Sequence, residues 1–545
     1  MKKIYLIMTA LFIYAAQAQE ALPVSDSLQT QSAGKKPSIV RLTGSIQSDI
    51  LFPEEDNAIG TGSYKDKVLT NTYVDLALSV ADYLTVGGRF EYLDHPLPGF
   101  EKDFAGWGVS YFYATGRYRN AELTVGDFYE QFGNGLTLRT YEERSLGIDN
   151  SIRGGRLILH PLKGLRLKAL GGKQRRYWDH NDSFLWGGDA ELNLDQWLRK
   201  LEEQDARLLL GLSYTGKHEK EEDIYIASDK KLNLPLNIAA FDVRLQFQKN
   251  GYNLMADYAW KINDPSFDNQ YSYDRGSVLL LSGSYSRKGM SFLLQAKRSE
   301  NMAFRSLRSM TGISSFINYL PAFTMQQTYA LPALYPYATQ PLGEWAFQGE
   351  ASYNLRRHTA LGGKYGTLIK LHASHIRALH KVSGLDNLYY QDINIMFEKK
   401  LSRSWKLNAM YMNQRYNQRV VEGHATNGDV IKSNIYVLEG KYQANRKLTF
   451  RGELQYLNTR QDEGDWLFAL LEVSVLPFLM FTVSDMYNSG ETNLHYYMVS
   501  ATYSHKSHRV QLGYGRTRAG YNCAGGVCRY VPASRGFQLS YNFNF

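Results

Sequence analysis

Apolar and polar residues alternate one by one along most of this chain. In the sequence VRLQFQ at 243–248, for example, each apolar residue is followed by a polar one. A period of two places successive side chains on opposite faces of a β-strand, so one face is apolar and the other is polar. The pattern recurs from Ile39 onward in segments of about ten residues, the length that a tilted strand needs to cross a bilayer. The pattern predicts an all-β protein.

The end of the chain shows the alternation most clearly. From position 537 the odd positions of the segment 535–545 are large and apolar, namely Phe537, Leu539, Tyr541, Phe543 and Phe545. A strand that ends on an aromatic residue is typical of the closing strand of an outer-membrane β-barrel, where a terminal Phe is a common assembly signal. An edge strand of a soluble sandwich is the alternative for this stretch taken alone.

The connections between these segments alternate in length. Short links such as 117–120 and 249–251 are followed by longer ones such as 131–151 and 299–344. Short periplasmic turns and long outer loops are expected of an outer-membrane barrel. One strand on each side of every link gives about 24 strands, with a range of roughly 22–26, and an even number leaves both ends in the periplasm. We therefore expect a large antiparallel transmembrane β-barrel over residues 39–545, with some loops folded inward.

The first residues carry an export signal. Lys2 and Lys3 precede an apolar stretch, and Ala-Gln-Ala at 16–18 is a cleavage site, so residues 1–18 are expected to be a signal peptide. Residues 19–38 are then a polar periplasmic leader, too short to form a plug domain. The expected location is the cell outer membrane.

Composition fits this picture. The chain has 40 Tyr and only 8 Trp, and Tyr suits a membrane–water boundary because it has an apolar ring and a polar hydroxyl. The net charge of +9 is interpreted as a solvated surface or lumen. Export disfavours a nucleic-acid partner. The expected partners are outer-membrane lipids and the barrel assembly machinery.

Several basic residues occupy the polar positions of the strands, among them Arg244 and Arg451. On the lipid face at the midplane each would cost ~2–4 kcal/mol, so they should face the lumen. Two interpretations follow. The charges either favour anions in a channel, or they pair with loops that fold inward.

A barrel of this width should be blocked, because barrels of about 16–18 strands already enclose a water channel. The first candidate is the glycine-rich segment 126–156, in which Arg144 or Arg153 could pair with Glu142 or Asp149. Paired acids also occur in glycosidases, but charged loops usually just pack. The candidate charges of this segment are Glu142, Glu143, Arg144, Asp149, Arg153 and Arg156.

The second candidate is the segment 299–344, the longest without a strand pattern. Its aromatic residues should not lie free in water, so we expect either a plug or an outward binding surface, with a helix over 307–320. The aromatic candidates are Phe316, Tyr319, Phe323, Tyr329, Tyr335 and Tyr337.

Other sites are weakly indicated. Cys523 and Cys528 are separated by four residues, and an exported chain favours a disulfide between them. A metal site lacks further ligands, and a redox pair would more often have two intervening residues.

The segment 193–205 has a helical apolar stripe, so we expect a short amphipathic helix at the inner membrane face, with partner docking as the alternative. Catalytic motifs are missing, so no enzyme, cofactor or metal is expected.

Three stretches together resemble a family of uncharacterised Bacteroidota outer-membrane proteins, the DUF6029 group. They are GDFYEQFGNGLTLRTYEERSLGIDNSIRG at 126–154, YLPAFTMQQTYALPALYPYATQPLGE at 319–344 and CAGGVCRYVPASRGF at 523–537. The likeness covers essentially the mature chain. It implies a location and a fold class, and it supplies no activity, substrate or catalytic residue.

Two functions from different classes follow. The first is a plugged channel or transport protein of unknown substrate. The alternative is a non-conducting subunit of a larger outer-membrane complex for secretion, assembly or surface-lipoprotein export, with other envelope proteins as partners.

Overall fold

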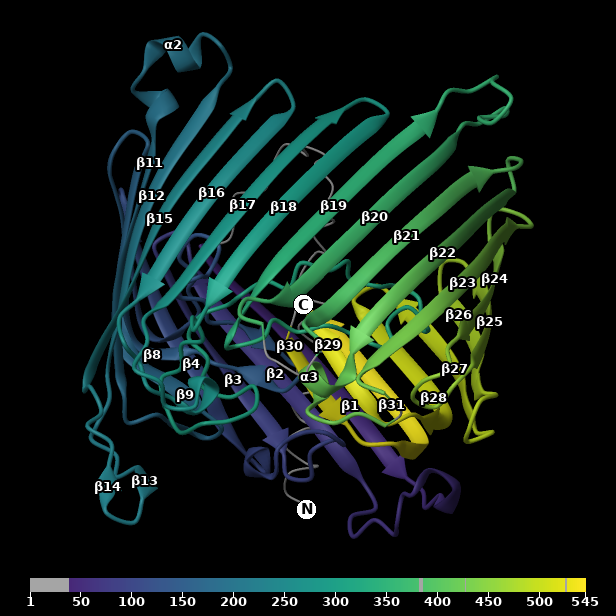
Figure 1. Cartoon of the computed structure of the whole chain (residues 1–545), viewed down its shortest axis with the longest axis horizontal. Helices are drawn as coiled ribbons and strands as arrows, with labels where there is room; N and C mark the ends of the chain where they lie inside the picture. Colours follow the sequence, from purple (N-terminus) through teal and green to yellow (C-terminus); the bar gives the residue numbers. More distant parts are fainter. Residues whose placement is uncertain (1–38, 382–385, 427, 525–526) are drawn as a thin grey trace.

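A closed antiparallel barrel makes up almost the whole structure, a computed structural model that describes residues 39–381, 386–426, 428–524 and 527–545. Within these residues the barrel has 24 strands (Figure 1). Its strands have 8–14 residues. This confirms the predicted fold class and strand number. The predicted signal peptide and leader, 1–18 and 19–38, lie outside the described residues.

The barrel strands follow one another around the wall in chain order. They are β1 (Val40–Pro53), β2 (Leu69–Val80), β3 (Leu84–Leu93), β4 (Gly106–Tyr118), β5 (Ala121–Phe128), β8 (Ile152–Leu162), β9 (Leu165–Arg176), β11 (Phe184–Asn193), β12 (Arg207–His218), β15 (Asn237–Lys249), β16 (Tyr252–Lys261), β17 (Gly276–Arg287), β18 (Met290–Glu300), β19 (Gly343–Leu355), β20 (Thr367–Ala378), β21 (Leu388–Lys400), β22 (Trp405–Asn417), β23 (Val430–Gln443), β24 (Leu448–Asn458), β25 (Trp466–Val475), β26 (Leu479–Asn488), β27 (His495–His505), β28 (His508–Thr517) and β31 (Ser534–Asn544).

The first and last strands close the barrel. β31 pairs with β28 on one side and with β1 on the other, from Ser45 opposite Asn544 to Pro53 opposite Gly536. Beyond the strand, the backbone N–H and C=O of Phe545 bond to those of Gly44, both at 3.0 Å. The closed ladder leaves no open strand edge, as a lipid environment requires. The predicted closing strand is therefore confirmed.

Burial is inverted relative to a water-soluble protein. On β12, Leu212 is 58% exposed on the outer face, whereas Thr215 and Lys217 on the inner face are fully buried. Exposed leucine, valine and aromatic side chains recur on the outer face of the other strands. Such a surface is stable against lipid and not against water, so the barrel spans a membrane.

The two ends of the barrel differ. At one end the strands are joined by short turns such as 119–120 and 250–251, and at the other by long loops. The segment 193–205 lies at the short-turn end (Figure 1), where it forms a 3-10 turn, η3 (Leu194–Gln196), and one α-helical turn, α2 (Arg199–Glu202). The short helix predicted there is therefore present only as a single α-helical turn that follows a 3-10 turn.

The remaining elements belong to the long-loop end. No helix forms over 307–320, which is irregular in the structure, so the helix predicted there is wrong. The short elements are η1 (Asn57–Ile59), η2 (Lys102–Phe104), β6 (Glu142–Glu143), β7 (Ile148–Asp149), β10 (Asp179–His180), which extends the pairing of β9, β13 (Tyr225–Ala227), β14 (Lys230–Lys231), η4 (Phe267–Asn269), α3 (Gln418–Glu422), β29 (Gly520–Ala524) and β30 (Val527–Val531).

Candidate functional site

Two loops fold into the barrel and pack against its inner face. We call residues 129–151, between β5 and β8, the first inner loop, and residues 301–342, between β18 and β19, the second inner loop. Phe132 and Phe304 from these loops are fully buried in one apolar cluster with inward-facing wall residues such as Ala240 and Ala346. The small wall side chains leave room for the large loop side chains.

Arg89 of β3 holds the first inner loop to the wall. Its guanidinium donates to Asp149 at 3.0 Å and to Glu142 at 2.9 Å on the loop, and to Asp75 of the neighbouring strand β2 at 2.7 Å. Only 6% of the Arg89 side chain is exposed. Charge-assisted hydrogen bonds of this kind are stronger than neutral ones.

Two further arginines extend this network. Arg144 of the loop donates to Asp75 at 2.8 Å and to Glu142 at 2.6 Å. Arg175 of β9 donates to Glu91 at 2.7 Å and to Asp149 at 2.6 Å. The network thus crosses between loop and wall several times, and it includes the predicted charges Glu142, Arg144 and Asp149.

The ionisation of Glu142 reflects its burial. Loss of water raises the pKa of this carboxyl group, although Arg89 and Arg144 oppose the shift. The network contains four carboxyl groups, of Asp75, Glu91, Glu142 and Asp149, and three guanidinium groups. A carboxylate in excess is costly to bury, which is consistent with the raised pKa at Glu142.

Three buried lysines attach the second inner loop to the wall. Lys217 of β12 donates to the carbonyl of Arg305 at 2.8 Å, Lys261 of β16 donates to that of Ala303, and Lys297 of β18 donates to that of Pro321 at 2.6 Å. These ammonium groups bind main-chain carbonyl oxygens of a segment that has no ladder partners of its own. They therefore satisfy buried loop backbone that strand pairing does not.

Each buried lysine also has a carboxylate partner. Asp264 lies 3.1 Å from both Lys217 and Lys261, and Glu344 lies 2.7 Å from Lys297. Burial alone would raise the pKa of the Asp264 carboxyl, but the two ammonium groups hold it below its ordinary value. The buried charges are thus paired, as low-dielectric surroundings require.

Tyrosines of the second inner loop bond to the loop between β24 and β25 and to β19. Tyr335 donates to Asp462 at 2.9 Å, and Tyr337 donates to Glu344. Burial raises the pKa of both tyrosines well above the ordinary value, so they stay neutral donors. Tyr329 and Phe323 are also buried, at 6% and 5% exposure. This segment lies inside the barrel and is not an outward surface.

The two inner loops also bind each other. The amide of Arg139 donates to the carbonyl of Ile317, and the amide of Tyr319 donates to that of Gly135, both at 2.8 Å. The guanidinium of Arg139 lies 4.0 Å from the centre of the Tyr319 ring, a cation–π contact. Asn150 donates to the carbonyl of Phe316 at 3.0 Å. The loops therefore form one connected body within the lumen.

Several predicted charges have other roles. Arg153 does not face the lumen: it pairs with Asp127 at 2.8 Å and lies against Phe112 on the outer face, so its predicted placement is wrong. Its position in the strand sets this, because Arg153 shares a face with outward-pointing Leu157. The side chain of Glu143 bonds to its neighbour Ser145, and the side-chain bonds of the described residues do not link Glu143 to the wall.

The remaining predicted arginines face inward and pair with carboxylates of the wall, and Arg156 also reaches Glu130 of the first inner loop at 3.3 Å. Arg156 bonds to Glu122 at 2.8 Å, and Arg244 bonds to Asp189 at 2.6 Å. Arg451 pairs with Glu439 and Glu453. With carboxylates beside them, these cations do not form the exposed basic lining that an anion channel needs.

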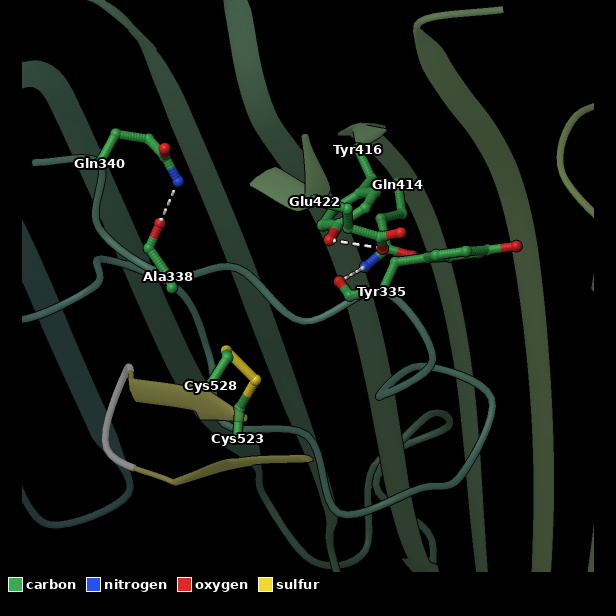
Figure 2. The surroundings of a disulfide bond; sticks show 8 residues. All are labelled: Tyr335, Ala338, Gln340, Gln414, Tyr416, Glu422, Cys523 and Cys528. Atoms are coloured by element: carbon green, nitrogen blue, oxygen red, sulfur yellow. Dashed lines mark hydrogen bonds between the residues drawn. A yellow bond between two sulfur atoms is a disulfide. The ribbon is translucent and has the colours of Figure 1, made fainter. Parts of the chain in front are cut away.

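The disulfide joins Cys523 to Cys528 across the β29–β30 hairpin, as expected. Figure 2 shows Ala338 and Gln340 of the second inner loop, Tyr416 of β22 and Glu422 of α3 among the residues around it. The neighbouring residue Arg529 donates to the carbonyl of Ser145 in the first inner loop at 3.1 Å. The hairpin thus lies over the inner loops.

The sequence reasoning missed the wall residues that hold the loops, chiefly Arg89, Arg175, Lys217 and Lys261. Arg89, Lys217 and Lys261 occupy inward polar positions of alternating strands, so their register could have identified them. Arg175 could not be found in this way, because it lies in the non-alternating end of β9 (GGKQRR at 171–176), at a position with the parity of outward-facing Leu167 and Ala169. The loop residues that these wall residues bind could not be identified in this way, because the loop sequences do not alternate between apolar and polar positions. Among the described residues no cluster of His, Cys, Asp and Glu fits a metal ion, and no helix in the described part is long and apolar enough to span a membrane.

Comparison with known proteins gives a family and distant structural likenesses. Solved structures that are similar include the siderophore receptor PirA from Pseudomonas aeruginosa (11% identity, 94% of this chain and 81% of the other covered, TM-score 0.40). The P pilus usher PapC translocation pore is also similar, with 11% identity, 92% of this chain and 99% of the other covered, and a TM-score of 0.43. So is OccAB3 from Acinetobacter baumannii, with 11% identity, 93% of this chain and 99% of the other covered, and a TM-score of 0.32. No curated protein matches the sequence. A family model matches residues 1–545 in full, and the chain therefore belongs to DUF6029, a family of unknown function.

Proposed function

We propose that this protein is an outer-membrane transport protein whose barrel is held closed by the two inner loops. The observation that carries the proposal is the way the loops are attached. Buried ion pairs and lysine–carbonyl bonds reach them from β2, β3, β9, β12, β16 and β18. A barrel of about 24 strands without these loops would leave an aqueous channel.

The loops share an apolar cluster with the wall, but much of their attachment is polar, as suits a closed state that can open. A permanent core needs only apolar packing, whereas buried charge pairs are often no more stable than well-packed apolar residues. Charged and tyrosine contacts between loop and wall can be exchanged for water when the loop moves. We therefore propose that the solute passes when one or both inner loops shift, and that the present structure is the closed form.

Conductance of the purified protein in planar bilayers tests this proposal. The intact chain should conduct little, and a variant with residues 303–338 replaced by a short Gly-Ser linker should open large, stepwise channels. The matched control shortens the β13–β14 hairpin, which projects away from the barrel (Figure 1), and should leave conductance unchanged.

The same preparations distinguish the alternative. Heat-modifiable gel migration first establishes that each barrel is folded. A folded, linker-bearing barrel that stays silent contradicts the proposal. An intact protein that is silent and purifies in fixed proportion with other envelope proteins would instead favour a non-conducting subunit of a larger complex.

A further inference from the structure

One part of the lumen wall lacks the charges found elsewhere. On the four described strands β26, β27, β28 and β31, the inward positions carry Ser, Thr, Asn, Gln, Gly, Met and Tyr, and one charged residue, Arg509, near the short-turn end. We call these inward positions the uncharged arc. Hydrogen bonds attach the inner loops to strands from β1, at Gln47, to β24, where Gln455 accepts from the amide of Leu331 at 2.8 Å. The hydrogen bonds of the described residues do not link the inner loops to the arc, so the arc has a different environment.

A cavity of about 510 Å³ lies against the uncharged arc. Ser500, Gln511, Gln538 and Ser540 line it together with Asp49 of β1, and Leu97, Pro98 and Val531 from the outer loops contribute apolar surface. Ligand sites in proteins usually have about 300–1,000 Å³ and combine apolar walls with a few polar groups. This cavity has both features.

The ionic groups at its edge are already engaged. The carboxylate of Asp49 accepts hydrogen bonds from Ser540 at 2.6 Å and from Gln47 at 2.9 Å. The guanidinium of Arg518 lies 3.8 Å from Glu463 and stacks over Trp466 at 5.5 Å. A charged solute would therefore lose its hydration without gaining an unoccupied counter-ion.

The neutral groups remain available. Gln511 and Gln538 are half-buried, and no side-chain bond of either is among those of the described residues. An amide both donates and accepts, as does the hydroxyl of Ser500, whereas the hydroxyl of Ser540 already donates to Asp49. Hydroxyl groups on a solute need partners of this double kind, and the C–H faces of a sugar ring fit apolar surface such as Met498 and Leu97.

We propose that this cavity binds an uncharged, hydroxyl-rich small molecule of the sugar class, on its way through the barrel. The inference rests on the proposed transport function and names the kind of solute. Under this proposal the two regions have different roles. The inner loops block the lumen, and the uncharged arc contacts the solute.

Equilibrium binding to the detergent-purified full chain tests the site without requiring an open channel. The probes are glucose, maltose and raffinose, with gluconate and maltobionate as charged counterparts, and saturation-transfer NMR with titration gives the affinity. At least one neutral sugar should bind, and its charged counterpart should bind at least tenfold more weakly. Gln511→Leu and Gln538→Leu should each weaken the neutral sugar about tenfold, while Gln391→Leu, on another strand and outside the cavity, should not.

Failure of this inference differs from failure of the proposed function. No binding by any neutral sugar, equal binding of charged and neutral probes, or insensitivity to both Gln511→Leu and Gln538→Leu overturns the sugar site even if the linker variant conducts. Specific binding with a silent linker variant supports the site and contradicts transport. Heat-modifiable migration of each variant verifies that the barrel is intact.

Discussion

The two sides of the lumen wall show how one barrel can serve two purposes. From β2 to β24 the inward positions carry arginine, lysine and carboxylates that grip the inner loops, as Arg89 and Lys297 do. From β26 to β31 they carry small polar groups beside a cavity. Buried charges need fixed partners, whereas neutral hydroxyls and amides tolerate exchange with water. The charged side therefore suits a fixed loop, and the uncharged side suits a passing solute.

Among the substitutions considered, removing Arg89 should weaken the attachment of the first inner loop to the wall most. Arg89→Met leaves Asp75, Glu142 and Asp149 without their shared cation, which should destabilise the inserted first inner loop by ~3–5 kcal/mol. Limited proteolysis within 129–151 should accelerate, and bilayer conductance should rise. The control is Arg117→Met, whose ion pair with Glu122 is half exposed and should be worth less than ~1 kcal/mol.

The second inner loop has an equivalent test at Lys297. Lys297→Met leaves the fully buried Glu344 without its cation and should loosen residues 321–342 by roughly 3 kcal/mol. Adding Glu344→Gln should recover much of that loss, because the unpaired charge disappears. Hydrogen exchange of the loop amides measures both variants; equal exchange in the single and the double variant would contradict the role given to this pair.

The disulfide should act locally. Cys523→Ser removes a cross-link over a separation of five residues, worth roughly 2 kcal/mol in the chain-entropy account. Cleavage between 518 and 533 should become faster, and membrane insertion should be unchanged. If this substitution abolishes barrel assembly, measured by heat-modifiable migration, the local role is wrong.

A new charge should be accepted differently on the two sides. Ser500→Asp places a carboxylate at a half-buried position beside the cavity, where water can hydrate the charge as long as no solute fills the space, and should change stability by less than ~0.5 kcal/mol. Ala346→Asp places one in the fully buried cluster under the second inner loop and should cost several times more. Thermal unfolding of the two variants in the same detergent compares them; equal losses would remove the distinction between the two sides.

The smallest expected effect is that of pH on the first inner loop. Because burial raises the pKa of Glu142 above its ordinary value of 4.5, protonation favours the inserted loop. This contribution is complete below the ordinary pKa and is lost as pH rises through the raised value. Amide exchange in residues 141–149, corrected for intrinsic rates, should show protection that falls with pH, and Glu142→Gln should remove the dependence.

The strands of the barrel wall could be predicted from the sequence, whereas the contacts of the inner loops within the lumen could not. Alternation with a period of two specifies which face each residue occupies, so the outward placement of Leu212 and the inward placement of Arg244 follow from it. The same rule would have placed Arg153 outward, and its position within a presumed loop concealed this. The number of strands could be counted from the connecting segments, because consecutive strands in the sequence pair with each other in the barrel.

The interior of the inner loops depends on contacts between distant residues. Arg139 meets Ile317, and Lys217 meets Arg305, across separations that no local pattern encodes. A helix was expected over 307–320, but contacts with the wall satisfy part of this backbone instead, among them the bond of 2.7 Å from the Gln174 amide of β9 to the carbonyl of Phe316. Tertiary contacts overrode local propensity there.

A cross-link between loop and wall tests the central claim most directly, that the inner loops occupy the lumen of the membrane-inserted barrel. The side chain of Asn134 in the first inner loop lies 3.2 Å from the sulfur of Met255 on the inner face of β16. In intact outer membranes, the pair Asn134→Cys and Met255→Cys should form a disulfide, detected by mass spectrometry. The pair Asn134→Cys and Leu254→Cys, whose second position faces lipid, should not. Absence of the first cross-link, or equal formation of both, would contradict the account.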